Sequence, residues 1–181
     1  ANQTTEDVFS LLDNLLKWTK SQIGKLKVVY QEFNMVEVVE SVSEIFTMVA
    51  GLKNIKIVQD MPVVPVVVRA DIDMLKTVIR NLISNAIKFS NEGSEVLVSL
   101  TEEDGMAIVS VKDSGCGIDE ENQKKLLHTD THFSTFGTNN EEGSGLGLLL
   151  CQDFIVKNGG KLWFTSKKGE GSTFSFSVPL L

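Results

Sequence analysis

The chain has 181 residues, of which 42% are hydrophobic and 23% are charged, and its formal net charge at pH 7 is −7. These values fit a globular chain with one domain of ordinary size, and they argue against wholesale disorder. The negative charge argues against an extended surface for nucleic acid or an anionic membrane, so an anion-binding site would have to be local.

The cellular setting follows from what the sequence lacks. Cys116 and Cys151 are the only cysteines, which provides no disulfide framework and indicates a reducing, cytoplasmic compartment. No apolar run approaches the roughly 20 residues of a membrane helix, so we expect no membrane contact. The chain begins with Ala1 instead of Met and has no signal peptide, so we expect a fragment or a processed chain.

The N-terminal segment has the pattern of one amphipathic helix. Apolar residues such as Leu11, Leu15 and Trp18 recur at helical spacing over residues 5–26 and give a wide apolar face. Such a face needs a partner. We expect either a core helix of the same domain or half of a helical hairpin whose other half is absent.

After residue 27, short apolar runs alternate with longer amphipathic ones. We predict strands over 28–33, 55–59, 63–69, 95–102, 106–112, 161–166 and 172–178, and helices over 35–52, 71–89, 120–127 and 146–157. Adjacent strands joined by short turns favour antiparallel pairing, with the helices on one face. The predicted class is therefore an α+β sandwich.

A polar stripe runs along the predicted helix 71–89. Asn81, Asn85 and Lys88 fall within an arc of about 60° at 100° per residue, opposite an apolar face. An amide oxygen can ligate Mg²⁺, and a lysine can contact the same phosphates. The alternative is a solvated helix face.

Two glycine-rich stretches follow. Asp113 ends a predicted strand and precedes Gly115 and Gly117, so its carboxylate could accept from an exocyclic amine such as that of adenine; the stretch is also an ordinary Asp-Ser-Gly turn. The run GSGLGL (143–148) precedes a helix whose free N–H groups could hold a phosphate, or it is a loose loop. Three such stretches in this order favour the functional interpretation.

Taken together, the motifs resemble those of the ATP-binding catalytic domain of sensor histidine kinases. This family belongs to a superfamily shared with type II topoisomerases, Hsp90-type chaperones and MutL-type repair proteins. RNLISNAIKFS (80–90) is similar to the asparagine box, DSGCGI (113–118) to the first glycine box, HFSTFGT (132–138) to the phenylalanine box, and GSGLGL (143–148) to the second glycine box. The resemblance covers residues 28–181, and residues 1–27 resemble the second helix of the dimerisation hairpin.

The resemblance implies a fold and a set of roles. The fold would be a two-layer sandwich of a mixed, mostly antiparallel sheet on three helices, with an N-terminal helix from a truncated hairpin. The cofactors would be ATP and Mg²⁺, and the partners would be a phosphoacceptor hairpin, a response regulator receiver domain and, in the full-length protein, a second copy. The site residues implied are Asn85 for Mg²⁺, Asn81 near the metal or phosphoryl group, Lys88 for phosphate, Phe89 beside adenine, Asp113 with Gly115, Gly117 and Ile118 for the adenine pocket, and Gly143, Ser144, Gly145, Leu146, Gly147 and Leu148 for phosphate and the lid hinge.

The sequence departs from the family's pattern in two places. His128 and His132 lack the acidic residue that follows a phosphoacceptor histidine, so we expect ATP binding without an acceptor of the chain's own. The predicted lid has no Lys or Arg between His128 and Ser144, which predicts weak phosphate binding.

The residue at position 81 separates the possible activities. ATP hydrolysers of the superfamily place a glutamate four positions before the metal-binding asparagine, and this chain has Asn81, which cannot act as a general base. A superfamily ATPase is therefore disfavoured relative to a histidine kinase. A nucleotide-binding regulatory module without transferase activity stays open. A serine kinase of the anti-sigma type would share the four motifs but would not begin with a hairpin helix.

Overall fold

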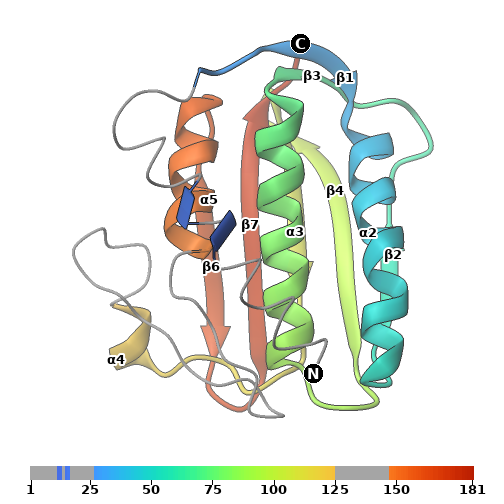
Figure 1. Cartoon of the computed structure of the whole chain (residues 1–181), viewed down its shortest axis with the longest axis vertical. Helices are drawn as coiled ribbons and strands as arrows, with labels where there is room; N and C mark the ends of the chain where they lie inside the picture. The colour runs from blue at the N-terminus through green and yellow to red at the C-terminus, as the bar shows by residue number, and fades with distance from the viewer. Residues whose placement is uncertain (1–11, 14, 17–26, 125–146) are drawn as a thin grey trace.

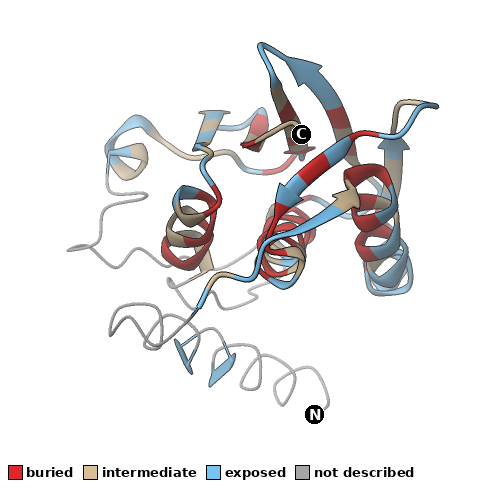
Figure 2. Cartoon of the chain, turned by 90° about the horizontal axis from the view of Figure 1, so that it is seen from above, coloured by how far each residue is buried: buried red, intermediate tan, exposed pale blue. Residues whose placement is uncertain are grey.

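A computed structural model of the chain describes residues 12, 13, 15, 16, 27–124 and 147–181. Two layers make up this part of the molecule, with three helices lying side by side across one face of a sheet (Figure 1). Seen from above, the helices form one row, and the buried residues gather between them and the strands (Figure 2). The α+β sandwich and the three-helix layer are confirmed.

The main sheet has five strands in the order β2-β4-β5-β7-β6, with β2 and β4 parallel and the other neighbours antiparallel. Its mixed, mostly antiparallel character was therefore predicted correctly. The strand bounds are β2 Lys56–Asp60, β4 Glu95–Glu103, β5 Met106–Lys112, β6 Leu162–Lys167 and β7 Gly171–Pro179.

A separate two-stranded antiparallel sheet pairs β1 (Gln31–Asn34) with β3 (Val67–Ala70). The predicted strands, 28–33 and 63–69, overlap β1 and β3 but begin three and four residues too early. Pro62 and Pro65 have no N–H to donate and restrict the residues before them, so regular pairing begins only at Val67. Before that point, Val66 N–H donates instead to the Asn34 side chain at 3.0 Å.

The helices form where the amphipathic pattern predicted them. Asp71 caps α3, because its carboxylate accepts from the N–H groups of Asp73 and Met74 at 3.1 Å each. The predicted helix 120–127 is described only as far as Lys124, and its helical part ends at Gln123. The helix bounds are α2 Met35–Leu52, α3 Ile72–Phe89, α4 Glu120–Gln123 and α5 Gly147–Lys157.

Buried side chains from both layers form one core. Val39 of α2, Ile79 of α3 and Leu150 of α5 meet Val98 and Phe176 from the sheet, and all of them are 2% exposed or less. Burying an aliphatic side chain of this size stabilises a fold by about 1.5–3 kcal/mol. Such a core holds α3, which lies between the other two helices (Figure 1), in a fixed position.

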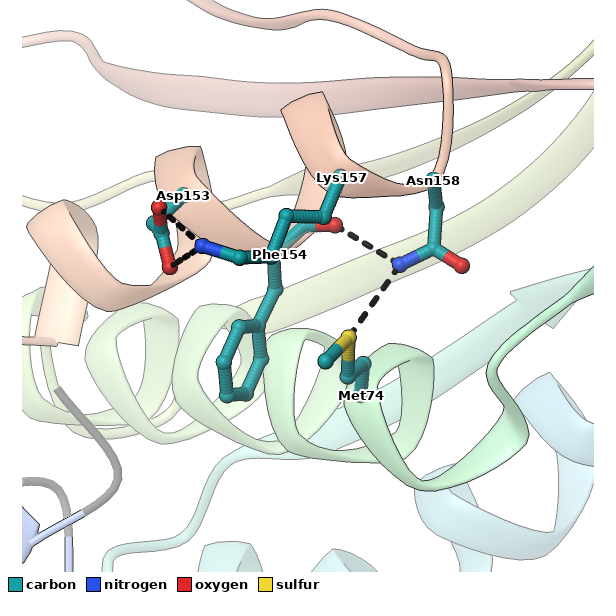
Figure 3. A network of polar contacts seen from close by, with 5 residues as sticks. All are labelled: Met74, Asp153, Phe154, Lys157 and Asn158. Atoms are coloured by element: carbon teal, nitrogen blue, oxygen red, sulfur yellow. Dashed lines mark hydrogen bonds and ion pairs between the residues drawn. The ribbon is translucent and has the colours of Figure 1, made fainter. Parts of the chain in front are cut away.

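The buried side-chain amide of Asn158 joins the beginning of α3 to the end of α5. Asn158, just after α5, accepts from the Asp71 N–H at 2.7 Å. Its side-chain amide also donates to the Phe154 carbonyl at 2.7 Å (Figure 3). The Asp71 carboxylate also accepts from Val29 N–H at 2.9 Å, in the segment that leads into β1. This end of the helix layer is thereby fixed without any of the predicted site residues.

Of the predicted helix 5–26, the described residues are 12, 13, 15 and 16, and all four are helical. The division into a hairpin helix (1–27) and a catalytic domain (28–181) stays a prediction. Within the described part of the chain, no helix has the length and apolar character to cross a membrane.

Candidate functional site

The polar stripe lies along the central helix of the layer. Asn81, Asn85 and Lys88 are all half-buried on α3, while their neighbour Ser84 is exposed. The buried face of α3 is wider than its apolar pattern predicted, because it contacts both flanking helices as well as the sheet. The stripe is thus partly enclosed by neighbouring elements and is not a fully solvated face.

Asn81 lies at the contact between α3 and α5. Its Oδ1 atom is 3.6 Å from the place that a Cβ would occupy at Gly147. A hydrogen bond with the Asn81 side chain also lowers the pKa of the Cys151 thiol, but complete burial outweighs it and raises that pKa to about 12. The stripe therefore meets the first turn of α5, where the predicted phosphate-binding stretch ends with Gly147 and Leu148.

Asp113 directly follows β5 and is buried, with 5% of its surface exposed. Its Oδ1 atom accepts from Gly115 N–H at 2.9 Å and from Ser172 N–H at 3.3 Å. Burial raises the pKa of the Asp113 carboxyl, and these two backbone N–H groups partly oppose that rise. Among the described residues, no hydrogen-bond donor reaches its other oxygen, Oδ2.

The glycines of this loop are needed because protein backbone packs against them. A Cβ at Gly115 would lie 1.8 Å from the Phe89 carbonyl oxygen, and one at Gly117 would lie 2.1 Å from the Lys167 carbonyl oxygen. Gly117 also has a positive φ of 65°, which favours glycine. The sequence analysis explained these glycines by the approach of a ligand. The structure gives another reason, which is that protein backbone atoms occupy the space a side chain would need.

The same loop joins the end of α3. Cys116 N–H donates to the Phe89 carbonyl at 3.3 Å, directly after the turn that carries Lys88. Lys88 and Phe89 are both half-buried. The structure thus brings the stripe together with Asp113 on one side and with the start of α5 on the other.

Sequence reasoning missed the residues that support this loop from the last two strands. Ser166 Oγ accepts from Ile118 N–H at 2.8 Å and shares a hydrogen bond of 2.7 Å with Ser172 Oγ. A Cβ at Gly171 would lie 2.2 Å from the Asp113 carbonyl oxygen, and the φ of Gly171 is 111°. The only signal in the sequence was the Gly-rich turn between the closing strands, which also fits an ordinary hairpin.

Part of the predicted site lies outside the described residues. These positions are Gly143, Ser144, Gly145 and Leu146, together with the two histidines, His128 and His132. Among the residues that are described, no group of three or more His, Cys, Asp or Glu side chains could hold a metal ion by itself.

The described polar groups are of the kinds that bind an adenine nucleotide. A buried carboxylate with one open oxygen recognises an exocyclic amine, and an amide and an ammonium on the adjoining helix recognise phosphate and a phosphate-bound cation. Since no acidic cluster is present in the described part, a metal ion would depend mainly on the phosphates and water.

The chain is similar to known proteins in sequence. Residues 70–181 match the family model described as "Histidine kinase-, DNA gyrase B-, and HSP90-like ATPase". The adaptive-response sensory kinase SasA of Crocosphaera subtropica is 34% identical over 171 residues, which cover 94% of this chain and 44% of the relative. The chain therefore spans less than half of that protein's length.

Solved structures agree on the fold. The catalytic domain of histidine kinase ThkA has a TM-score of 0.72 at 30% identity, covering 83% of this chain and 95% of that one. Full-length ShkA, solved in complex with AMPPNP, has a TM-score of 0.79 at 23% identity, covering 96% of this chain and 36% of that one. The chain therefore belongs to the histidine kinase-, DNA gyrase B- and HSP90-like ATPase family, and within it to the ATP-binding catalytic domains of sensor histidine kinases.

Proposed function

We propose that this chain binds ATP with Mg²⁺ and transfers the γ-phosphoryl group to a histidine on a separate hairpin helix, for relay to a response regulator. One observation supports the nucleotide site above the others. The Asp113 carboxylate is buried and is fixed through Oδ1 by two backbone N–H groups, while Oδ2 accepts no hydrogen bond from any residue in the described part of the chain.

The adenine end of the nucleotide lies at Asp113 in this proposal. The exocyclic amine donates to Oδ2, and the half-buried Phe89 packs beside the base. Because Oδ1 is held by Gly115 and Ser172, the acceptor is already oriented when the base arrives. Because an ionised carboxylate can only accept, it pairs with the exocyclic amine of adenine and repels the carbonyl oxygen that guanine has at the same ring position, so adenine is preferred over guanine.

The phosphates lie toward the stripe and the start of α5. Lys88 contacts a phosphate oxygen, and residues 143–148 contribute N–H groups. The Asn85 amide oxygen would hold Mg²⁺, which would neutralise phosphate charge when bound. The absence of an acidic cluster in the described residues agrees with this division, because Mg²⁺ leans on phosphates and water in such sites.

The reaction is an in-line displacement. A nitrogen of the acceptor imidazole forms a bond to the γ-phosphorus while the bond to the ADP oxygen breaks, and ADP leaves with that oxygen. Positioning and charge neutralisation provide most of the acceleration. Asn81 lies against α5 and has no carboxylate to activate water, which favours transfer over hydrolysis.

Partners follow from the chemistry. The acceptor histidine is on a hairpin of the same protein or of a second copy, and the phosphoryl group then passes to the aspartate of a receiver domain. Such an assembly is expected to be a homodimer in the full-length protein.

A reconstituted transfer reaction tests the proposal. The 181-residue chain is incubated with Mg²⁺, γ-labelled ATP and a separately made hairpin that carries the acceptor histidine, taken from a related kinase. We expect label on the hairpin, and about a 100-fold slower transfer for Asn85→Ala, while the matched control Ser84→Ala behaves like the wild type. Nucleotide binding without any label on the hairpin would support the alternative, a regulatory module that only senses ATP.

A further inference from the structure

A buried lysine directly after α2 contacts the C-terminal end of α3, next to the predicted nucleotide site. Lys53 is the first residue after α2 and is 8% exposed. Its Nζ donates to the carbonyls of Ile87 at 3.1 Å and of Lys88 at 2.9 Å. The ammonium therefore binds the backbone of the turn that carries Lys88.

With these two bonds, each of the last four carbonyls of α3 accepts a hydrogen bond. The last four carbonyls of an α-helix have no partner within the helix. Here the Ala86 carbonyl accepts from Ser90 N–H at 3.0 Å, and the Phe89 carbonyl accepts from Cys116 N–H at 3.3 Å. Lys53 provides the donors for the two carbonyls between them, and its positive charge also complements the negative end of the helix dipole.

The position of this turn controls the Asp113 loop. Because a Cβ at Gly115 would lie 1.8 Å from the Phe89 carbonyl oxygen, the loop and the last turn of α3 are in direct backbone contact. A shift of that turn must move the loop as well. Gly115 is also the residue whose N–H holds Asp113 Oδ1.

Backbone hydrogen bonds fix the turn that contains Lys53. Its own N–H donates to the Ala50 carbonyl at 3.0 Å, and Ile55 N–H donates to the same carbonyl at 2.9 Å. The following turn is tied to the segment after α3, since Gly93 N–H donates to the Asn54 carbonyl at 3.1 Å. Hydrogen bonds therefore hold Lys53 both at its backbone and at its side-chain ammonium group.

We propose that Lys53 is a positioning residue of the nucleotide site, which holds the last turn of α3 and, through the Phe89 carbonyl, the Asp113 loop in the geometry that binds adenine. It does so without contacting the nucleotide. This assignment rests on the proposed function.

The test compares variants of the 181-residue chain by calorimetry with Mg·ADP and with adenosine, well below the midpoint of thermal unfolding. We expect Lys53→Met, which keeps the buried methylenes, to weaken binding of both ligands by about tenfold. Lys53→Arg, which can donate to both carbonyls, should stay within about threefold of the wild type. The matched control Lys56→Met, at an exposed position just after the same turn, should bind like the wild type.

Amide exchange separates positioning from loss of global stability. In Lys53→Met, the Ser90 amide, in the last turn of α3, should exchange faster, while the Val109 amide in β5 should keep its wild-type rate. Equal acceleration at both positions would show general destabilisation and would contradict the proposal. If Lys53→Met does not fold, the comparison is made with Lys53→Gln, and wild-type affinity in that variant would contradict the proposal equally.

The two proposals fail in different ways. Wild-type protein that binds neither Mg·ADP nor adenosine would overturn the proposed function, and this assignment with it. Wild-type binding that is unchanged in Lys53→Met would overturn the role of Lys53 alone.

Discussion

The carbonyl oxygen of Phe89 occupies the space that a side chain on Gly115 would need, at 1.8 Å from the ideal Cβ position. This contact joins the end of α3 to the loop that holds Asp113. Two of the three motifs identified in the sequence therefore form one rigid unit, and the properties of the site depend on this contact.

Gly115→Ala should disrupt that unit. The added methyl group must displace backbone atoms, so we expect destabilisation by about 1–3 kcal/mol or more, together with loss of nucleotide binding. Thermal unfolding and calorimetry measure the two effects. Gly51→Ala is the matched control, because no atom lies within 4 Å of a Cβ at this position in α2, and we expect it to be neutral or to stabilise by about 0.5–1 kcal/mol. Wild-type stability in Gly115→Ala would show that the contact is not as close as described.

Asp113 should make stability depend on pH in a defined direction. Burial raises the pKa of its carboxyl above the ordinary value of 3.8, so the folded state holds this proton more tightly than the unfolded state does. Its contribution to stability is fully present below pH 3.8 and is lost as the pH rises through the raised pKa. The gain in unfolding free energy of Asp113→Asn over the wild type should therefore be larger at pH 7 than near pH 4.

Denaturant titrations of both proteins over this pH range test the point, because the other carboxylates cancel in the difference. A difference for Asp113→Asn that is constant with pH would mean that the carboxyl is not perturbed in the folded state.

The two cysteines should differ sharply in reactivity. Cys116 is exposed in the Asp113 loop, whereas Cys151 is fully buried and has its pKa raised to about 12. Because the thiolate is the nucleophile, iodoacetamide at pH 8 should modify the folded protein once, at Cys116, and Mg·ADP should slow this step. Peptide mass spectrometry identifies the site. Modification of Cys151 at a comparable rate in folded protein would contradict the described burial.

The Asn158 network should affect stability without affecting the site. Asn158→Asp places a carboxylate beside Asp71. It also removes the donor to the Phe154 carbonyl, a hydrogen bond drawn in Figure 3. We expect destabilisation by about 2–4 kcal/mol with nucleotide affinity unchanged in the folded protein. Calorimetry below the unfolding transition measures the nucleotide affinity of the folded variant. An affinity weaker than that of the wild type would mean that the two ends of α3 are coupled.

The sequence was sufficient for the elements with strong periodicity. The spacing of apolar residues located α2 and α3, and the turn before Met106 located β4 and β5, because local pattern and tertiary burial agree in these elements. The sequence was not sufficient for the bounds of β1 and β3. Their pairing joins segments more than 30 residues apart, and it can begin only after Pro62 and Pro65.

The site was predictable only in part, for a related reason. Motif spacing identified Asn81, Asn85 and Asp113 as polar groups at unusual positions. The supports of the loop, Ser166 and Lys53, come from elements distant in sequence, and only their hydrogen bonds in the folded chain distinguish them from ordinary turn and helix-end residues.

The most direct test of the central claim is a titration of the isotopically labelled chain with Mg·ADP, followed by NMR. A nucleotide between the stripe and the Asp113 loop should shift the amides of Gly115 and Cys116 and the side-chain amide of Asn85 more than any signal of the β1–β3 sheet. Shifts confined to that sheet, with Gly115 and Asn85 unchanged at saturating nucleotide, would contradict the claim.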